Sequence, residues 1–512
     1  MADLLLADLL RAPAVIEVPD WAVISSIIAS ALVVVNFLIQ GFALGVIPEN
    51  RRPSTGMAWL LAIVLVPVLG LALFLLFGSP RVGRTRHLKQ TEINELIAAR
   101  VAGLERPKTT APSAYLQTVV DLNQRLGALP LSSGNRVHLI EDYRGSIQAM
   151  AHEVRRAESF VHVEFYITAW DEVTDPLFQA MTEAVERGVD VRLLFDHLGS
   201  RGIPGYQEML KRLATTGIQW YPMLPIEPLK GRFRRPDLRN HRKLLVVDGK
   251  VGFTGSLNLT EPGYNKPKNH KVGREWVELM LRIEGPAVAS LDAIFATDWD
   301  AETDEQLHVE AREATGSAAA DALEFPEVPE VAVQVVPSGP GFESENNLRM
   351  FTSLLYAATE RISITSPYFV PDESLLYAVT TAAQRGIAVE LFVSEQADQF
   401  MVGHAQASYY AALLRAGVRI YLYPAPWVLH SKHFSIDDDV AVVGSSNMDM
   451  RSFALNYELS ALLIGREMVE KLRVVEDHYR SLSRELTPDE WQGRPFRLRY
   501  VDNVMRLTSA LQ

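Results

Sequence analysis

Two long stretches near the N-terminus contain no charged side chain. The first runs from Trp21 to Pro48 and the second from Pro53 to Pro80. Each is longer than the roughly 20 apolar residues that an α-helix needs to cross the hydrocarbon core of a bilayer. Helices in the core of soluble proteins seldom stay uncharged over such a length. The pattern therefore predicts a transmembrane hairpin, with an N-terminal segment at residues 1–20 and helices at residues 21–47 and 57–79.

The lysines and arginines that flank these stretches predict their orientation, because such residues are enriched in cytoplasmic loops. The loop between the stretches holds Arg51 and Arg52, whereas four basic residues follow the second stretch between positions 81 and 89. This excess predicts that the N-terminus and the rest of the chain both lie in the cytoplasm. Acidic residues before Trp21 disfavour a cleaved signal peptide, which begins with a basic segment.

Beyond about residue 110, short β-rich runs alternate with helix-like segments, and the same order occurs twice. The run "SFVHVEFYI" from Ser159 has its counterpart in "RISITSPYFV" from Arg361. Each is followed by a helix-like segment that ends in Arg-Gly, where glycine suits a left-handed helix C-cap. An apolar run comes next, as is typical of a strand in a sheet covered on both faces. A repeat of roughly 200 residues indicates a domain duplication.

The repeat predicts an α/β protein with two similar domains. We expect a juxtamembrane linker at residues 80–110, the first domain at residues 111–300 and the second at residues 331–512. Residues 301–330 between them are acidic, rich in alanine and punctuated by proline. This composition is typical of an exposed linker.

Composition narrows the chemistry. The chain has no cysteine, which excludes disulfides, thiolate metal sites and a cysteine nucleophile. Its formal net charge is −12, so no overall basic field attracts nucleic acid. An anionic substrate must therefore be bound by local basic groups.

One polar motif occurs in both halves. Histidine and lysine stand two residues apart, an aspartate follows, and Gly-Ser-x-Asn comes at the same offset in each copy. Residues two apart on a strand point to the same face, so each histidine projects with its lysine. A single copy is usually an exposed strand, but two copies at matched places indicate a shared function. The polar members are His241, Lys243, Asp248, Ser256 and Asn258, and His430, Lys432, Asp437, Ser445 and Asn447.

The remaining acidic residues suggest supporting roles. Five residues along a regular strand span about 16 Å, so Asp248 and Asp437 should not contact a phosphate held by their own lysine. We expect them to fix a turn or neighbouring backbone. Glu278 and Glu458 lie on apolar, strand-like runs, where a buried carboxylate is costly unless it is paired. They are candidates to orient the histidines, and exposed edge positions are the alternative.

Two copies of HxKxxxxD followed by GSxN are the signature of the phospholipase D superfamily, which this chain resembles. Further blocks, including "RNHRKLLVVDG", "SPYFVPDESL" and "GSSNMDMRSFALNYE", resemble the bacterial cardiolipin synthases over almost the whole chain. The first half departs from the second by the insertion "TEPGYNKPKNHKVGREW", which makes the alignment around Glu278 less certain. The resemblance implies two pseudo-symmetric phospholipase D-like α/β/α domains after the transmembrane hairpin, with the active site at their interface.

The resemblance also implies a reaction through a phosphohistidine, with no metal and no cofactor. Two phosphatidylglycerol molecules would give cardiolipin and glycerol at a bacterial inner membrane. A membrane-bound hydrolytic phospholipase D is the alternative, and a nuclease or a non-catalytic scaffold fits less well. His241 would be the nucleophile and His430 the acid and base. The implied catalytic positions are His241, Lys243, Asp248, His430, Lys432 and Asp437, supported by Ser256, Asn258, Glu278, Ser445, Asn447 and Glu458.

Three stretches leave alternatives open, and the oligomeric state is open as well. The basic stretch "LKGRFRRPDLRNHRK" could bind anionic head groups or form a solvated loop. The aromatic residues of "YPAPWVLH" could line a path for acyl chains or pack in the core. The amphipathic C-terminus, "PFRLRYVDNVMRLTSALQ", could pack on the catalytic body or contact the bilayer.

Overall fold

The computed structural model describes residues 21–49, 53–78, 111–227, 232–233, 235–307, 328, 330–342 and 345–509. The chain forms two compact units, Met1–Pro80 and Arg81–Gln512. The predicted segments 1–20 and 80–110 lie outside the described residues, as does most of the predicted linker at 301–330.

The first unit contains one long helix and two short ones. Helix α1 is Trp21–Val46, α2 is Pro53–Leu65 and α3 is Pro67–Phe77. Among the described residues, only Ser25–Val46 forms a helix long and apolar enough to cross a membrane. The first predicted span is thus supported, but the second is not a continuous helix.

Proline explains the break in the second stretch. Pro67 has no backbone N–H and its ring clashes with the carbonyl of the preceding turn, so the helix ends before it. Val66 accordingly leaves the helical conformation, with φ −138° and ψ 78°. Helix α3 then packs closely on α2 at Gly70. A Cβ at this position would lie only 2.7 Å from the Ala62 carbonyl oxygen, so the close approach requires glycine.

The second unit is built on one sheet of 16 strands to which both halves contribute. The strand order is β4-β3-β2-β8-β9-β11-β1 in the first half and β12-β21-β19-β18-β13-β15-β16-β22 in the second, joined where β1 pairs with β12. The sixteenth strand, β7 (Arg239–Asn240), pairs with β21 outside this order. The strands of the first half are β1 Ser132–Ile140, β2 Phe160–Phe165, β3 Asp190–Asp196, β4 Gln219–Met223, β8 Lys243–Val247, β9 Val251–Gly255 and β11 Met280–Glu284. Those of the second are β12 Glu330–Ser338, β13 Arg361–Thr365, β15 Ala388–Ser394, β16 Arg419–Tyr423, β18 His433–Ile436, β19 Val440–Gly444, β21 Asn456–Ile464 and β22 Arg484–Leu486.

The two halves repeat the same topology, which confirms the predicted duplication. In each half three strands run parallel, and a meander of antiparallel strands that carries the motif follows. Short strands complete the connections: β5 Ile226–Glu227, β6 Arg232–Phe233, β7 Arg239–Asn240, β10 Trp276–Val277, β14 Phe369–Val370, β17 Val428–Leu429 and β20 Met448–Asp449.

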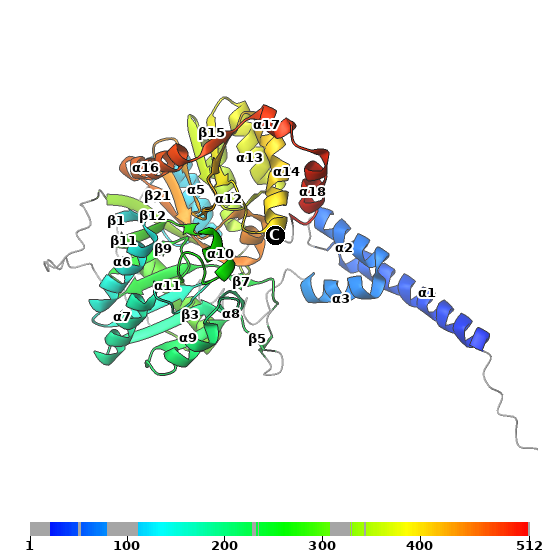
Figure 1. Ribbon diagram of the computed structural model, residues 1–512, viewed down its shortest axis with the longest axis horizontal. Helices are drawn as coiled ribbons and strands as arrows, with labels where there is room; N and C mark the ends of the chain where they lie inside the picture. Colours follow the sequence, from blue (N-terminus) through cyan, green and yellow to red (C-terminus); the bar gives the residue numbers. More distant parts are fainter. Residues whose placement is uncertain are drawn as a thin grey trace, which may run out of the picture. The chain divides into compact units, whose positions relative to one another are not determined.

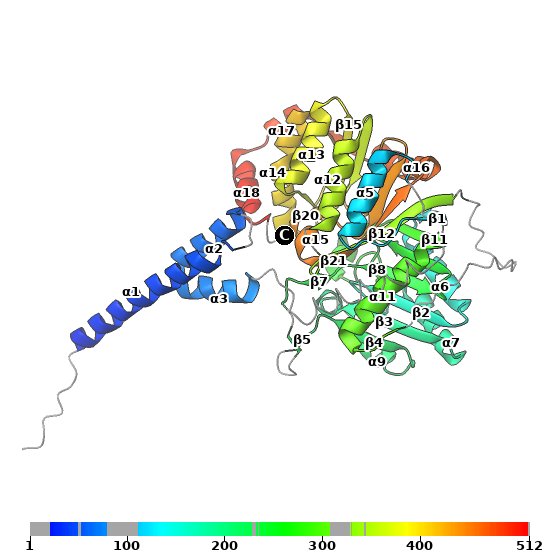
Figure 2. The same cartoon turned by 180° about the vertical axis from the view of Figure 1, so that it is seen from behind.

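Helices cover the sheet on both faces (Figures 1 and 2). Helices α11 and α16 share one core cluster with strands of both halves. On the other face, α6, α7 and α9 pack on the first half, and α5, α12, α13 and α14 pack on the second. The helices are α5 Ala114–Arg125, α6 Tyr143–Arg155, α7 Asp175–Glu186, α8 His197–Arg201, α9 Tyr206–Leu213, α10 Pro267–Val272, α11 Ala287–Thr303, α12 Asn346–Ala357, α13 Glu373–Gln384, α14 Phe400–Ala416, α15 Met450–Ala454, α16 Arg466–Leu482, α17 Pro488–Gln492 and α18 Phe496–Arg506.

Candidate functional site

Two short parallel pairings link the halves where the motifs begin. Strand β7 pairs with the start of β21, so that Asn240 lies opposite Tyr457. Strand β10 pairs with β17, so that Val277 lies opposite Leu429. In each case the residue before a motif histidine is in register with the residue before a glutamate of the other half. This register places each histidine beside the glutamate of the opposite half.

The side chains use this register to form two crossed pairs. The Nδ1 atom of His241 lies 2.9 Å from Oε2 of Glu458, and Nδ1 of His430 lies 2.7 Å from Oε1 of Glu278. All four side chains are buried. The predicted pairing of the glutamates with the histidines is therefore present, and the insertion in the first half does not disturb it. Neither half holds a complete pair, so each motif depends on the other half.

An ionised glutamate at Nδ1 has a chemical consequence. A carboxylate can only accept a hydrogen bond, so it favours the ring tautomer with the proton on Nδ1. The Nε2 atom is then left with its lone pair. For His241 this makes Nε2 available as a nucleophile or a base.

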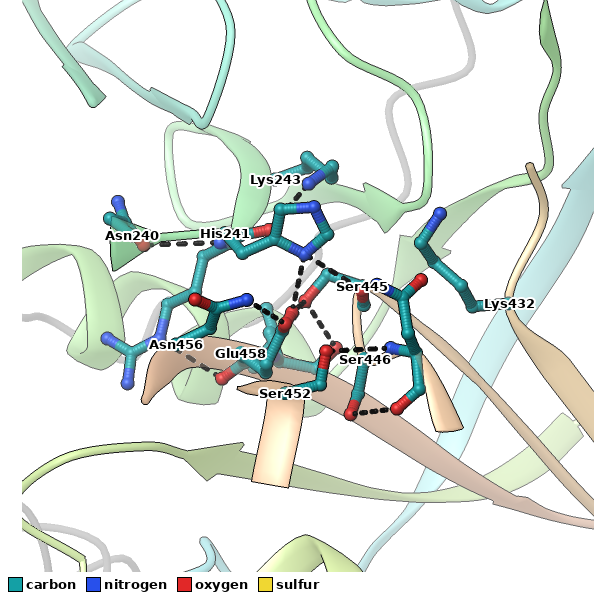
Figure 3. Close-up of polar contacts among 12 residues, drawn as sticks. Asn240, His241, Lys243, Lys432, Ser445, Ser446, Ser452, Asn456 and Glu458 are labelled. Carbon is teal, nitrogen blue, oxygen red and sulfur yellow. Dashed lines mark hydrogen bonds and ion pairs between the residues drawn. The ribbon is translucent and has the colours of Figure 1, made fainter. Parts of the chain in front are cut away.

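The two motif lysines make equivalent contacts, each with the backbone of the histidine in its own motif. The Nζ atom of Lys243 donates to the carbonyl oxygen of His241 at 2.6 Å, and Nζ of Lys432 donates to that of His430 at 2.5 Å. Figure 3 shows Lys243 and Lys432, which come from opposite halves, both extending to the surroundings of the His241 ring. Burial lowers the pKa of Lys243 to about 7 and that of Lys432 to about 8. An anionic ligand between them would stabilise their charged forms.

Burial keeps both histidines neutral at pH 7. Burial lowers the pKa of His241 to about 4, and Glu458 opposes that shift. Burial also lowers the pKa of His430 well below its usual value, and the charges on Lys432 and Lys243 lower it further. Since His430 responds to the charge of Lys243 from the other half, both motifs act within one electrostatic site.

The two glutamates differ in a way that their symmetric placement does not suggest. Burial raises the pKa of Glu278 to about 7, although Lys432 opposes the shift. Burial also raises the pKa of Glu458, but His241, Lys243 and Ser445 outweigh it and leave the pKa below its usual value. Ser445 donates a hydrogen bond of 2.5 Å to Glu458. Glu458 is therefore ionised at neutral pH, while Glu278 keeps its proton to a higher pH than Glu458 does.

The motif aspartates accept hydrogen bonds from backbone N–H groups and make none to a histidine. The carboxylate of Asp248 accepts from three backbone N–H groups at the start of β2, at 2.8 to 2.9 Å. Asp437 binds the backbone before β13 in the same way, with Thr359, Glu360 and Arg361 as donors. Asp248 directly follows β8, which begins at Lys243, and Asp437 directly follows β18, which begins one residue after Lys432.

The serines and asparagines are largely engaged inside the protein. Ser256 and Ser445 accept from the backbone N–H groups of Leu279 and Leu459, each at 2.9 Å. Asn258 donates to the hydroxyl of Tyr264 at 2.7 Å, so it supports the first-half insertion. Among the named asparagines and serines, only Asn447 has a buried side-chain oxygen without a hydrogen-bond partner. Asn447 is thus the residue of this group best placed to bind a ligand.

Two tyrosines lie beside the histidines, although the sequence analysis does not include them among the site residues. The ring of Tyr166 lies 4.9 Å from that of His241, and the ring of Tyr368 lies 6.4 Å from that of His430. The hydroxyl of Tyr368 donates to the half-buried carboxylate of Asp398 at 3.0 Å. Tyr166 directly follows β2, and Tyr368 comes three residues after the equivalent strand β13, so an aromatic residue shortly after each strand was the available signal.

The stretches left open by the sequence are partly resolved. In the basic stretch, Arg235 pairs with Asp237, Arg239 with Asp196 and Arg242 with Asp298. These arginines are therefore engaged internally, while residues 228–231 and 234 lie outside the described part. In the aromatic stretch, Tyr423 packs in the core, whereas Trp427 is exposed.

The paired His-Lys motifs on a duplicated sheet define a phosphodiester-transferring site of the phospholipase D type. The family model described as "Cardiolipin synthase, PLD-like domain" matches residues 150–299 and 351–478, and the one described as "Phospholipase_D-nuclease N-terminal" matches residues 28–79.

Curated relatives include cardiolipin synthase A of Pectobacterium carotovorum subsp. carotovorum, 31% identical over 93% of this chain and 96% of the relative. Cardiolipin synthase A of Serratia proteamaculans is also 31% identical, with the same coverage. The fold resembles that of phosphatidylserine synthase of Haemophilus influenzae Rd KW20, with a TM-score of 0.55 and 14% identity over 77% of this chain and 99% of that one. The chain belongs to the cardiolipin synthase family of the phospholipase D superfamily.

Proposed function

We propose that the protein transfers a phosphatidyl group from one phosphatidylglycerol to another, which forms cardiolipin and releases glycerol. The observation that carries the proposal is the crossed pairing of His241 with Glu458 and of His430 with Glu278. This pairing brings both motifs together in one site, and the chain that carries the site belongs to the cardiolipin synthase family.

The different pKa values of the glutamates favour His241 as the nucleophile. The pair of His241 and ionised Glu458 holds one proton, on Nδ1, and leaves Nε2 with a lone pair. The pair of His430 and Glu278 retains a second proton on its carboxyl group below about pH 7. Since that proton can pass through the imidazole ring, this pair can act as the general acid.

The first step forms a covalent intermediate. Nε2 of His241 bonds to phosphorus, and the bond from phosphorus to the glycerol oxygen breaks. The His430–Glu278 pair gives its extra proton to that oxygen, so neutral glycerol leaves. Lys243 and Lys432 balance the charge on the phosphoryl oxygens, where fixed positive charge stabilises the transition state.

The second step reverses the roles. A hydroxyl of the second phosphatidylglycerol gives its proton to the His430–Glu278 pair and bonds to phosphorus, and the bond between Nε2 of His241 and phosphorus breaks. One phosphodiester replaces another, so no nucleotide is consumed. Water competes as the acceptor, and the deep burial of both histidines limits its access.

The products distinguish transfer from hydrolysis. Full-length enzyme in vesicles that contain labelled phosphatidylglycerol should form cardiolipin, with one glycerol released for each molecule formed. A hydrolytic phospholipase D would instead produce mainly phosphatidic acid, and that result would refute the proposal. The variant His241→Ala should form neither product, which controls for contaminating activity.

We also propose a location in the bacterial inner membrane, with more than one membrane segment and a cytoplasmic catalytic unit. The apolar α1 and the basic residues between positions 81 and 89 support this. We propose residues 111–300 and 331–512 as the two halves, although α11 continues to Thr303 and β12 begins at Glu330, so the linker between them is shorter than the predicted 301–330. Because the chain lacks cysteine, a single introduced cysteine in the catalytic unit should react with membrane-impermeant reagents only after the cells are opened.

A further inference from the structure

The C-terminal helix α18 packs on the catalytic body, which answers one part of the question left open by the sequence. It lies along α14 in both views (Figures 1 and 2). On its inner face, Asp502 binds His404 at 2.7 Å and Arg494 at 2.8 Å. Met505 packs against the core of the second half. The only acidic residue of α18 is thus buried and paired.

The outer face of α18 combines apolar and basic residues. Phe496, Tyr500 and Leu507 are 73%, 61% and 85% exposed. At 100° per residue these positions fall within roughly 40° of one another around the helix. Arg497 and Arg499 flank this stripe, and both are exposed. Helix α18 thus packs on the catalytic body through one face only, and its other face exposes aromatic and cationic side chains.

The start of α14 extends this surface. Phe400 and Met401 are exposed. The ring of Phe400 lies 4.4 Å from that of His404, the residue that binds Asp502 of α18. We name the surface formed by Phe400, Met401, Phe496, Tyr500 and Leu507 the C-terminal patch.

The patch is directly connected to the candidate active site. Gln399, which precedes Phe400, donates to the hydroxyl of Tyr368 at 2.9 Å. Tyr368 also binds Asp398, and its ring faces His430. A surface that contacts the patch would therefore lie next to the residues that surround His430.

We propose that the C-terminal patch rests on the surface of an anionic bilayer and brings the His430 side of the site to the lipid head groups. The exposed face of α18 carries arginines and no acidic residue, although the chain as a whole has a net charge of −12. Aromatic side chains flanked by arginines are typical of helices that lie in the membrane interface, and basic residues there attract anionic lipids. This contact goes beyond the proposed reaction and does not depend on it.

A fluorescent label on a single cysteine tests the proposal, because the chain has no cysteine of its own. Asn503 is exposed on the same face as Tyr500, so Asn503→Cys places the label within the patch and keeps its apolar residues. Val474 is 67% exposed and belongs to α16, a helix that lies far from α18 in both views, so Val474→Cys provides the matched control. The full-length protein is reconstituted in vesicles of phosphatidylcholine, with or without phosphatidylglycerol.

We expect the label at position 503, and not that at 474, to shift its emission to the blue and to be quenched by nitroxide-labelled acyl chains. Quenching should be stronger with phosphatidylglycerol. Adding Arg497→Gln and Arg499→Gln should weaken the contact roughly fivefold per arginine. Emission at 503 that matches 474, or quenching equal in both kinds of vesicle, would overturn the proposal. A blue shift without lipid quenching would also overturn it, because the patch would then be covered by protein, either the N-terminal helices or a second copy.

Discussion

The proton attributed to Glu278 leads to a specific prediction for the variant Glu278→Gln. Burial raises the pKa of Glu278 to about 7, so its carboxyl group is protonated below that pH and ionised above it. If this proton reaches the leaving glycerol through His430, the rate of phosphoenzyme formation should fall as the pH rises through 7. With a single such group, the rate at pH 8 should be about one tenth of that at pH 6.

Glutamine has a similar shape but cannot release a proton. The variant should lose the contribution of the general acid, about 10²- to 10⁴-fold in rate. Its residual rate should no longer change between pH 6 and pH 8. Rapid-quench measurement of glycerol release in a single turnover reports this step without the second transfer.

A matched control is available in the other half. The pKa of Glu458 lies below its usual value, so Glu458→Gln should slow the reaction but keep the fall above pH 7. A lysine is the competing explanation, because burial lowers the pKa of Lys243 to about 7 as well. If Glu278→Gln kept the same fall in rate above pH 7, the titrating group would be a lysine and the proposed acid would be refuted.

Three further predictions concern the frame of the site. Lys243→Met and Lys432→Met should each lower kcat by about 10²- to 10³-fold, because each removes fixed charge near the phosphoryl group, and a loss confined to one of them would contradict the shared site. Gly444→Ala should lower the thermal midpoint in detergent, because its Cβ would lie 2.3 Å from the Leu459 carbonyl oxygen. Gly386→Ala is the control: its Cβ would have no atom within 4 Å, so only the strain of a backbone with φ +91° remains, at a cost of about 1 kcal/mol. Asp437→Ala should destabilise the fold by about 2 kcal/mol, because it removes the acceptor of several backbone N–H groups, and unchanged urea unfolding would count against this role. Hydrogen bonds lower the pKa of Asp437 below 3.8, so wild type should keep this contribution above pH 3.8 and lose it as the pH falls through the lower folded value.

Local patterns in the sequence predicted much of the fold and most members of the site. The matched offset from His241 to Gly255 and from His430 to Gly444 was sufficient to identify the duplicated motif. The break at Pro67 was predictable too, because proline ends a helix whatever its surroundings. Hydropathy does not reveal it, because a single proline hardly changes the apolar character of an uncharged stretch.

Features set by tertiary contacts could not be predicted. The pairing of each histidine with the glutamate of the other half depends on the register of β7 with β21 and of β10 with β17, which two-residue strands do not reveal. The different pKa values of Glu278 and Glu458 arise from the lysines, histidine and serine around each carboxylate, so equal motifs conceal them. The bond between Asn258 and Tyr264 likewise depends on how the insertion folds.

The most direct test of the central claim is to locate the phosphorus in the trapped intermediate. Enzyme mixed with phosphatidylglycerol that carries ³²P is quenched in base, digested and mapped for phosphohistidine. The label is predicted on the peptide that contains His241, and it should disappear in His241→Ala. Label on His430 instead, or cardiolipin formation without any labelled histidine, would contradict a shared site in which His241 attacks phosphorus.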